Sequence, residues 1–112
     1  MHCADDSDAA VAVCHVSMHL ATGGLERLLV EFARRSDPRR FRPFFVALDR
    51  LGRPAEEIRA MGCPVYSLGA CRTRRQRLAR LRALIREHGA RIVHTHNTYA
   101  HFYGALAGRW AG

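Results

Sequence analysis

The chain has 112 residues, of which 48% are hydrophobic and 25% charged. This length supports one domain at most, and this composition excludes both a disordered chain and a membrane-embedded one. The net charge is +8 and all 18 basic residues are arginine, a side chain whose planar guanidinium suits phosphate and carboxylate partners. An all-arginine composition also arises from the nucleotide composition of a gene, and we favour that interpretation over selection for binding.

The cysteines and the apolar runs indicate where the protein resides. Cys3, Cys14, Cys63 and Cys71 form no C-x-x-C pair, and we recognise no secretory leader ahead of them. This pattern predicts reduced thiols and a cytoplasmic protein, with Cys14 and Cys63 as small buried side chains. No stretch approaches the roughly 18 to 20 apolar residues of a membrane span, so we expect a soluble or peripheral protein.

The first predicted elements are a strand and a helix. Residues 1–10 show no periodicity and predict a flexible acidic leader, so the structured domain should cover residues 11–112. Residues 11–16, VAVCHV, are almost continuously apolar, which is typical of a buried parallel strand. The helix that follows ends at Asp37 and Pro38. Its apolar residues recur at the spacing of one helical face: Leu25, Leu28, Leu29, Phe32 and Ala33.

Further strands and helices alternate to the end of the chain. Strands are predicted over residues 43–49, 65–68 and 92–96. A short helix ends at Gly62, and a long helix over residues 74–88 stops at Gly89. The inward face of the long helix comprises Leu78, Leu81, Leu84 and Ile85. A last helix follows the fourth strand, with its apolar face formed by Tyr99, Phe102, Tyr103, Leu106 and Trp110.

This alternation predicts an α/β fold. We expect a Rossmann-like parallel sheet of about four strands in the order 3-2-1-4, with helices on both faces. That order places the first and fourth strands side by side, and ligands of such sheets bind at the carboxyl ends of the strands. Two loops therefore matter most, residues 17–24 after the first strand and residues 95–98 after the fourth.

The first of these loops ends in Gly23 and Gly24, immediately before a helix. Glycines let backbone N–H groups approach an anion, and a helix amino terminus carries partial positive charge. The loop therefore predicts a phosphate contact, while a tight strand-to-helix turn explains the same two residues. Neither the G-x-G-x-x-G spacing nor a P-loop is present, so we expect no cofactor.

The second loop follows two histidines at alternate positions, His94 and His96. Alternate strand residues share a face, so these imidazoles can bind zinc together. Spacing places no third ligand, and we favour a site without metal. We expect His94 to be partly buried against the helices and His96 to hydrogen-bond a polar ligand. Asn97 and Thr98 extend this candidate site, and both also suit capping of the next helix.

These motifs, in this order, resemble a known family. GG-x-E-R opens the first helix, and I-V-H-T-H-N closes the fourth strand before TYAHFYGALAG. Residues 11–112 thereby resemble the amino-terminal domain of family four glycosyltransferases. The resemblance implies an enzyme with two Rossmann-like domains. Such an enzyme moves a sugar from a nucleotide diphosphate sugar to an acceptor, with retention and without requiring a metal.

The same resemblance implies roles for the loop residues. Gly23 and Gly24 lie near the donor phosphates, His96 contacts the sugar or acceptor near the reacting carbon, and Asn97 and Thr98 bind substrate. The implied acceptor is a lipid-linked or cell-envelope glycan precursor, or a small molecule. The family's carboxy-terminal donor domain, with its paired glutamates, is not found in the sequence. We therefore expect a truncated, acceptor-side half of a double-Rossmann enzyme that is inactive alone.

The arginines around the long helix leave a second function open, that of a non-catalytic basic module. Such a surface can dock on anionic lipid or another phosphate-rich partner, including the inner face of a membrane, while we expect no nucleic acid partner. A solvated helix face has the same pattern, and we favour it. Glu87 is the only acid among these residues: Arg72, Arg74, Arg75, Arg77, Arg80, Arg82, Arg86 and Arg91.

Overall fold

The fold alternates strands and helices along the chain. A computed structural model describes residues 10–17, 24–49, 51–96, 105, 107–109 and 111. The elements are β1 (Val11–Ser17), α1 (Gly24–Arg35), β2 (Phe41–Ala47), α2 (Arg53–Ala60), β3 (Val65–Ser67), α3 (Arg74–His88) and β4 (Ile92–Thr95). The described residues after position 104 are helical. The predicted leader over residues 1–9 and most of the predicted last helix lie outside the described residues.

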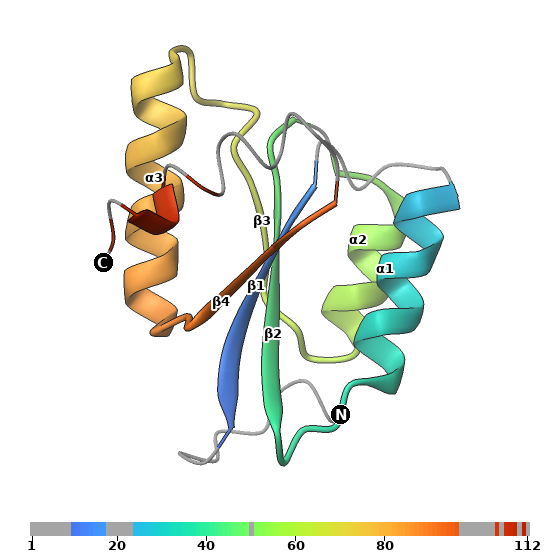
Figure 1. The fold of residues 1–112 in the computed structure, drawn as a ribbon. Coiled ribbons are helices and arrows are strands. Elements are labelled where there is room, and N and C mark those ends of the chain that lie inside the picture. The colour runs from blue at the N-terminus through green and yellow to red at the C-terminus, as the bar shows by residue number, and fades with distance from the viewer. Residues whose placement is uncertain are drawn as a thin grey trace.

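The strands form one parallel sheet in the order β3-β2-β1-β4, which confirms the predicted α/β topology. β1 is an inner strand of the sheet and pairs with β2 on one side and with β4 on the other. β2 begins at Phe41 and not at Pro43, because pairing with β1 already starts where Val11 lies opposite Phe41. The sheet therefore brings the carboxyl ends of β1 and β4 side by side (Figure 1).

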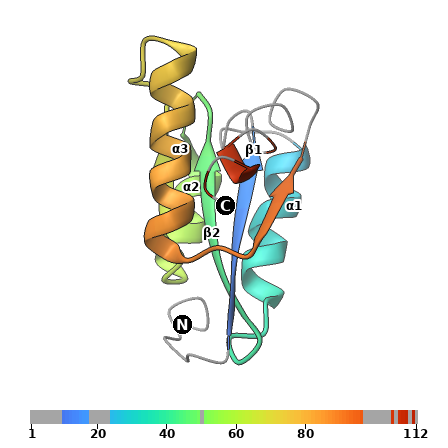
Figure 2. The ribbon, with the colours of Figure 1, turned by 60° about the vertical axis from the view of Figure 1, so that its left-hand side comes forward.

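Helices cover both faces of the sheet. Figure 2 shows α3 on one side of the strands and α1 on the other, with α2 beside α1 in Figure 1. Alternate residues of the central strands therefore enter different cores. The core under α3 includes Cys14, Val16, Phe44, Val46, Leu81 and Leu84, and the core under α1 and α2 includes Leu29, Val30, Ala33, Phe45, Ala47 and Ile58.

The long helix α3 has the predicted bounds because both of its ends are capped. The Thr73 hydroxyl accepts a hydrogen bond from the Gln76 backbone N–H at 3.1 Å, and the Gln76 side chain accepts one from the Thr73 N–H. This capping box satisfies two backbone donors of the first turn. At the other end Gly89 has φ 62°, a left-handed conformation that favours glycine. Leu81, Leu84 and Ile85 are buried, as predicted, and Leu78 is partly buried.

Helix α1 buries only part of the predicted face. Leu29, Val30 and Ala33 are fully buried, whereas Leu28 is 52% and Phe32 44% exposed. The reason is that α1 packs over β1 and β2 with α2 alongside, which leaves its flank toward β4 uncovered among the described residues.

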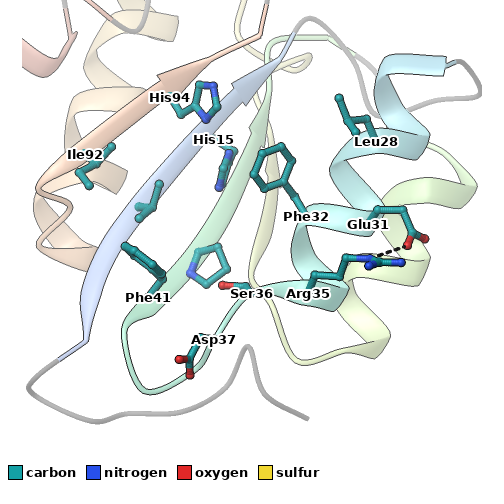
Figure 3. A pocket seen from close by; sticks show the side chains of 12 residues that line it. His15, Leu28, Glu31, Phe32, Arg35, Ser36, Asp37, Phe41, Ile92 and His94 are labelled. Carbon is teal, nitrogen blue, oxygen red and sulfur yellow. Dashed lines mark hydrogen bonds and ion pairs between the residues drawn. The ribbon is translucent and has the colours of Figure 1, made fainter.

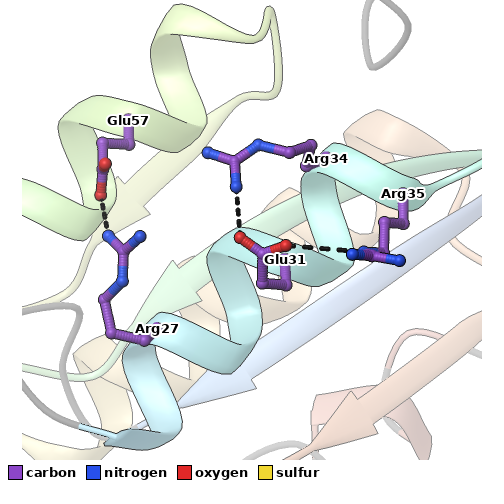
Figure 4. A network of polar contacts seen from close by, with 5 residues as sticks. All are labelled: Arg27, Glu31, Arg34, Arg35 and Glu57. Atoms are coloured by element: carbon purple, nitrogen blue, oxygen red, sulfur yellow. Dashed lines mark hydrogen bonds and ion pairs between the residues drawn. The ribbon is translucent and has the colours of Figure 1, made fainter.

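Ion pairs lie on the solvent-accessible surface of α1. Arg27 pairs with Glu57 of α2, and Glu31 pairs with Arg34 and Arg35 within α1 (Figure 4). These side chains are largely solvent-accessible. Exposed pairs of this kind contribute about 0 to 1 kcal/mol each, so the Arg27–Glu57 pair, which joins the two helices, orients α1 on α2 more than it stabilises the fold.

The cysteines differ from one another. Cys14 and Cys71 are free thiols, whereas Cys63 is disulfide-bonded, so the expectation of reduced thiols is wrong at Cys63. Among the described residues, no helix combines the length and the apolar character that a membrane crossing requires.

Candidate functional site

The candidate site lies where β1 and β4 end. Val16 of β1 lies opposite Thr95 of β4, and the backbone N–H of His96 donates to the Val16 carbonyl at 3.1 Å. Helix α1 begins at Gly24 at the same end of the sheet (Figure 1). The predicted neighbourhood of the two loops is therefore confirmed for their described ends. Gly23, Asn97 and Thr98 lie outside the described residues, so their predicted contacts stay predictions.

Three histidines meet at this end of the sheet. Nδ1 of His15 lies 3.1 Å from Nε2 of His96, within hydrogen-bond distance. The ring centroids of His94 and His96 are 4.2 Å apart, and those of His15 and His94 are 5.4 Å apart. One ligand nitrogen from each ring lies within 4.8 Å of the other two. The histidine cluster, defined as His15, His94 and His96, therefore joins β1 to β4 and to the residue that follows β4.

The cluster is built by strand register. His15 lies directly opposite His94 in the parallel pairing, so both side chains project from the same face of the sheet. His96 follows two positions later and returns to that face. The face is the one that α1 covers, and the Phe32 ring of α1 lies 5.6 Å from His15 and 6.0 Å from His94, centroid to centroid.

Burial differs sharply among the three rings. His15 is 7% exposed and stacks on Phe45, with centroids 4.8 Å apart, whereas His96 is partly buried and His94 is exposed. The expectation that His94 would be the partly buried ring is therefore wrong. The reason is that the sheet face beside α1 is open at β4, where Ile92 is also 45% exposed.

Burial also sets the protonation of the cluster. Desolvation, with smaller effects of His96 and His94, lowers the pKa of His15 to about 3. Desolvation, with a smaller effect of His94, lowers the pKa of His96 to about 4. Both rings are therefore neutral at pH 7, and each has one N–H donor and one nitrogen lone pair. Such rings can exchange hydrogen bonds with sugar hydroxyls or bind a metal ion.

A groove runs from the cluster along the sheet. It encloses about 570 Å³ between α1 and β4. His15 and His94 lie near one end, and Ser36 and Asp37 lie at the other (Figure 3). Two charged residues of α1, Glu31 and Arg35, also line the groove, and the rest of its lining is apolar: Val13, Leu28, Phe32, Phe41, Pro43 and Ile92. The groove therefore offers an apolar floor next to the histidines, with charged side chains of α1 at its side.

His15 is the residue that sequence reasoning missed. It lies in the apolar run of β1 and is separated from His96 by 81 positions in the chain. The available signal was the predicted strand order combined with the alternation of side chains between the two faces of a strand. A histidine in the first strand, beside a strand whose two histidines share one face, predicts the cluster when its own side chain lies on that face.

The fold and this site define a Rossmann-like α/β domain with a polar site at the carboxyl edge of its parallel sheet. Residues 22–112 match the family model of Glycosyltransferase Family 4, and the chain therefore belongs to that family. The match includes every described element except β1, so it contains His94 and His96 but not His15. Comparison with curated proteins and with solved structures gives no match.

Proposed function

We propose that this chain is the acceptor-side half of a retaining glycosyltransferase. It would help move a sugar from a nucleotide diphosphate sugar to a glycan, lipid-linked or small-molecule acceptor. The observation that supports this proposal is the family match combined with the position of His96 at the carboxyl edge of the sheet, beside the end of β1. We propose that the transfer requires no metal and no cofactor.

His96 is the proposed catalytic residue. Its ring is neutral and shares a hydrogen bond with His15, which fixes the position of one nitrogen. The remaining ring nitrogen is then available to a sugar or acceptor hydroxyl near the reacting carbon. His15 acts through His96 and is a positioning residue in this proposal.

The start of α1 is the proposed phosphate contact. Negative charge builds on the leaving diphosphate during transfer, and oriented backbone N–H groups at a helix amino terminus stabilise such charge. Helix α1 begins at Gly24. Gly23, before this helix, and Asn97 and Thr98, after His96, are proposed as further substrate contacts.

The donor is proposed to bind mainly to a carboxy-terminal domain. The chain alone should then bind acceptor sugars without turning over donor. We propose a cytoplasmic setting, in which the disulfide of Cys63 is an exception to the usual reduced state of thiols. The proposed process is cell-envelope glycan synthesis, with contact with the inner face of a membrane where the acceptor is a lipid.

Nuclear magnetic resonance of the labelled chain tests the proposed site. UDP-glucose, GDP-mannose and a panel of mono- and disaccharides are added in turn at millimolar concentration. We expect at least one probe to shift the backbone amide of Gly24 or the ring signals of His96. The His96→Gln variant should lose the ring-dependent shifts, whereas Glu56→Gln, a change at an exposed position of α2, should retain them. Unchanged spectra at both positions with every probe contradict the proposal.

The arginines of α3 support a membrane contact as a second proposal. Arg74, Arg75 and Arg86 are exposed on a helix whose opposite face is buried on the sheet. Each arginine near an anionic surface contributes about 1 kcal/mol. The chain should sediment with vesicles that contain phosphatidylglycerol and not with neutral vesicles, and an Arg74→Gln/Arg75→Gln variant should sediment less. Equal sedimentation with both kinds of vesicle removes this proposal.

A further inference from the structure

The histidine cluster has the composition of a transition-metal site. Three imidazole nitrogens, one each from His15, His94 and His96, lie within 4.8 Å of one another. Imidazole is a ligand that zinc, copper and nickel ions bind well, and three histidines are a known protein ligand set for Zn²⁺. The sequence alone supplied two of these ligands, and the register of β1 against β4 supplies the third.

The spacing of two of the nitrogens fits a tetrahedral ion. Ligand atoms about 2.0 to 2.1 Å from such an ion lie about 3.4 Å from each other. Nδ1 of His15 and Nε2 of His96 are 3.1 Å apart. The separation of these two atoms therefore suits a shared ion, provided that the two rings turn so that a lone pair of each faces it.

The side chain of His94, the third ligand, can rotate toward the ion. His94 is exposed, and its ring lies beside that of His96 at a centroid distance of 4.2 Å. Rotation of this side chain brings its nitrogen to the ion, while the buried ring of His15 stays stacked on Phe45. The fourth position of a tetrahedral ion would remain open to water.

The proton balance of binding is simple. One of the two nitrogens joined by the hydrogen bond now carries the shared proton. On binding, that ring transfers its proton to its other nitrogen through solvent, and both rings then present lone pairs. Each imidazole keeps one N–H, so no net proton is released.

We propose that His15, His94 and His96 bind one divalent first-row transition-metal ion, of the class of Zn²⁺, Co²⁺ or Ni²⁺. The ion is not a cofactor of the transfer proposed above. It uses the same His96 ring, so bound metal should prevent His96 from contacting a sugar. Metal binding at this site is therefore an inhibitory event.

Titration of the tag-free chain with Co²⁺, followed by visible absorption, tests the site. We expect one ion per chain with the intense bands of a tetrahedral complex, and displacement of Co²⁺ by Zn²⁺. His94→Gln is the variant of choice, because His94 is exposed and its loss should leave the fold intact. It should weaken binding by more than about tenfold, since even outer-shell partners of metal ligands contribute roughly 10- to 100-fold.

His88→Gln is the matched control. His88 hydrogen-bonds Tyr66 at 2.8 Å on the other side of the molecule, away from the cluster. It should leave the affinity for Co²⁺ unchanged, and circular dichroism confirms that both variants are folded. The proposal is overturned by the absence of binding below millimolar Co²⁺, or by equal weakening in the two variants. The titration contains no sugar, so its failure leaves the proposed transferase function standing.

Discussion

Lowering the pH from 7 to 5 should destabilise the fold through His15. In the unfolded chain His15 has the ordinary histidine pKa of 6.5, whereas in the folded chain burial lowers it to about 3. Between these two values the unfolded state binds the extra proton. The contribution of His15 to the free energy of unfolding is therefore constant above pH 6.5 and falls as the pH drops below that value.

The size of this effect follows from the pKa shift. Each pH unit below 6.5 costs about 1.4 kcal/mol per histidine that stays neutral in the fold. At pH 5 this is about 2 kcal/mol for His15. His96 acts in the same direction because its pKa is also lowered, to about 4, but its partial exposure makes its contribution smaller. A loss of this size is a large part of the stability of a small domain.

Urea unfolding at pH 5, 6 and 7 in the presence of a chelator measures this loss. The His15→Phe variant keeps a ring to stack on Phe45 but cannot titrate. Between pH 7 and pH 5 the free energy of unfolding of this variant should fall by about 2 kcal/mol less than that of the original chain. Val16→Ala is the control, because it removes fully buried methyl groups from the same strand and should lower stability equally at all three pH values. The reasoning is refuted if the original chain and His15→Phe lose the same free energy over this range.

Three further predictions concern the fold. Leu84→Ala should lower the free energy of unfolding by about 2 to 5 kcal/mol in urea titrations, because Leu84 of α3 is fully buried; a loss below about 1 kcal/mol, little more than the transfer of one CH2 group, contradicts that burial. Gly89→Ala should cost about 1 to 2 kcal/mol in the same assay, because its φ of 62° is strained for any residue with a Cβ; Ala79→Ser, on the exposed face of α3, is the control. Cys71 should react with a thiol reagent in the native chain, whereas Cys14 should react only after unfolding, because burial raises its pKa to about 12; equal rates contradict the burial of Cys14.

The order of the strands could be predicted from general rules of topology, and the bounds of α3 could be predicted from local signals. Apolar runs separated by helices leave few parallel topologies. Thr73 and Gly89 provide a cap and a left-handed stop, whose effects depend only on neighbouring residues. The bounds of β2 were less accurate, because they depend on which residues of β1 lie opposite.

The face that α1 buries could not be predicted from its own sequence. Leu28, Leu29, Val30 and Phe32 form a broad apolar surface, and helical spacing alone permits more than one face to be buried. The position of α2 decides the outcome, and it leaves Leu28 and Phe32 beside the groove. Of the candidate site, His94 and His96 could be found from spacing, whereas His15 required the pairing of two strands far apart in sequence.

The stacking of His15 on Phe45 connects the cluster to the protein interior. Phe45 is 1% exposed and belongs to the core that α1 and α2 cover. The position of His15 consequently depends on the folded core, so any ligand that His15 binds would be released when the chain unfolds. Occupancy of the histidines should thus raise the melting temperature in proportion to the logarithm of ligand concentration, which makes thermal unfolding a general screen for whatever this domain recognises.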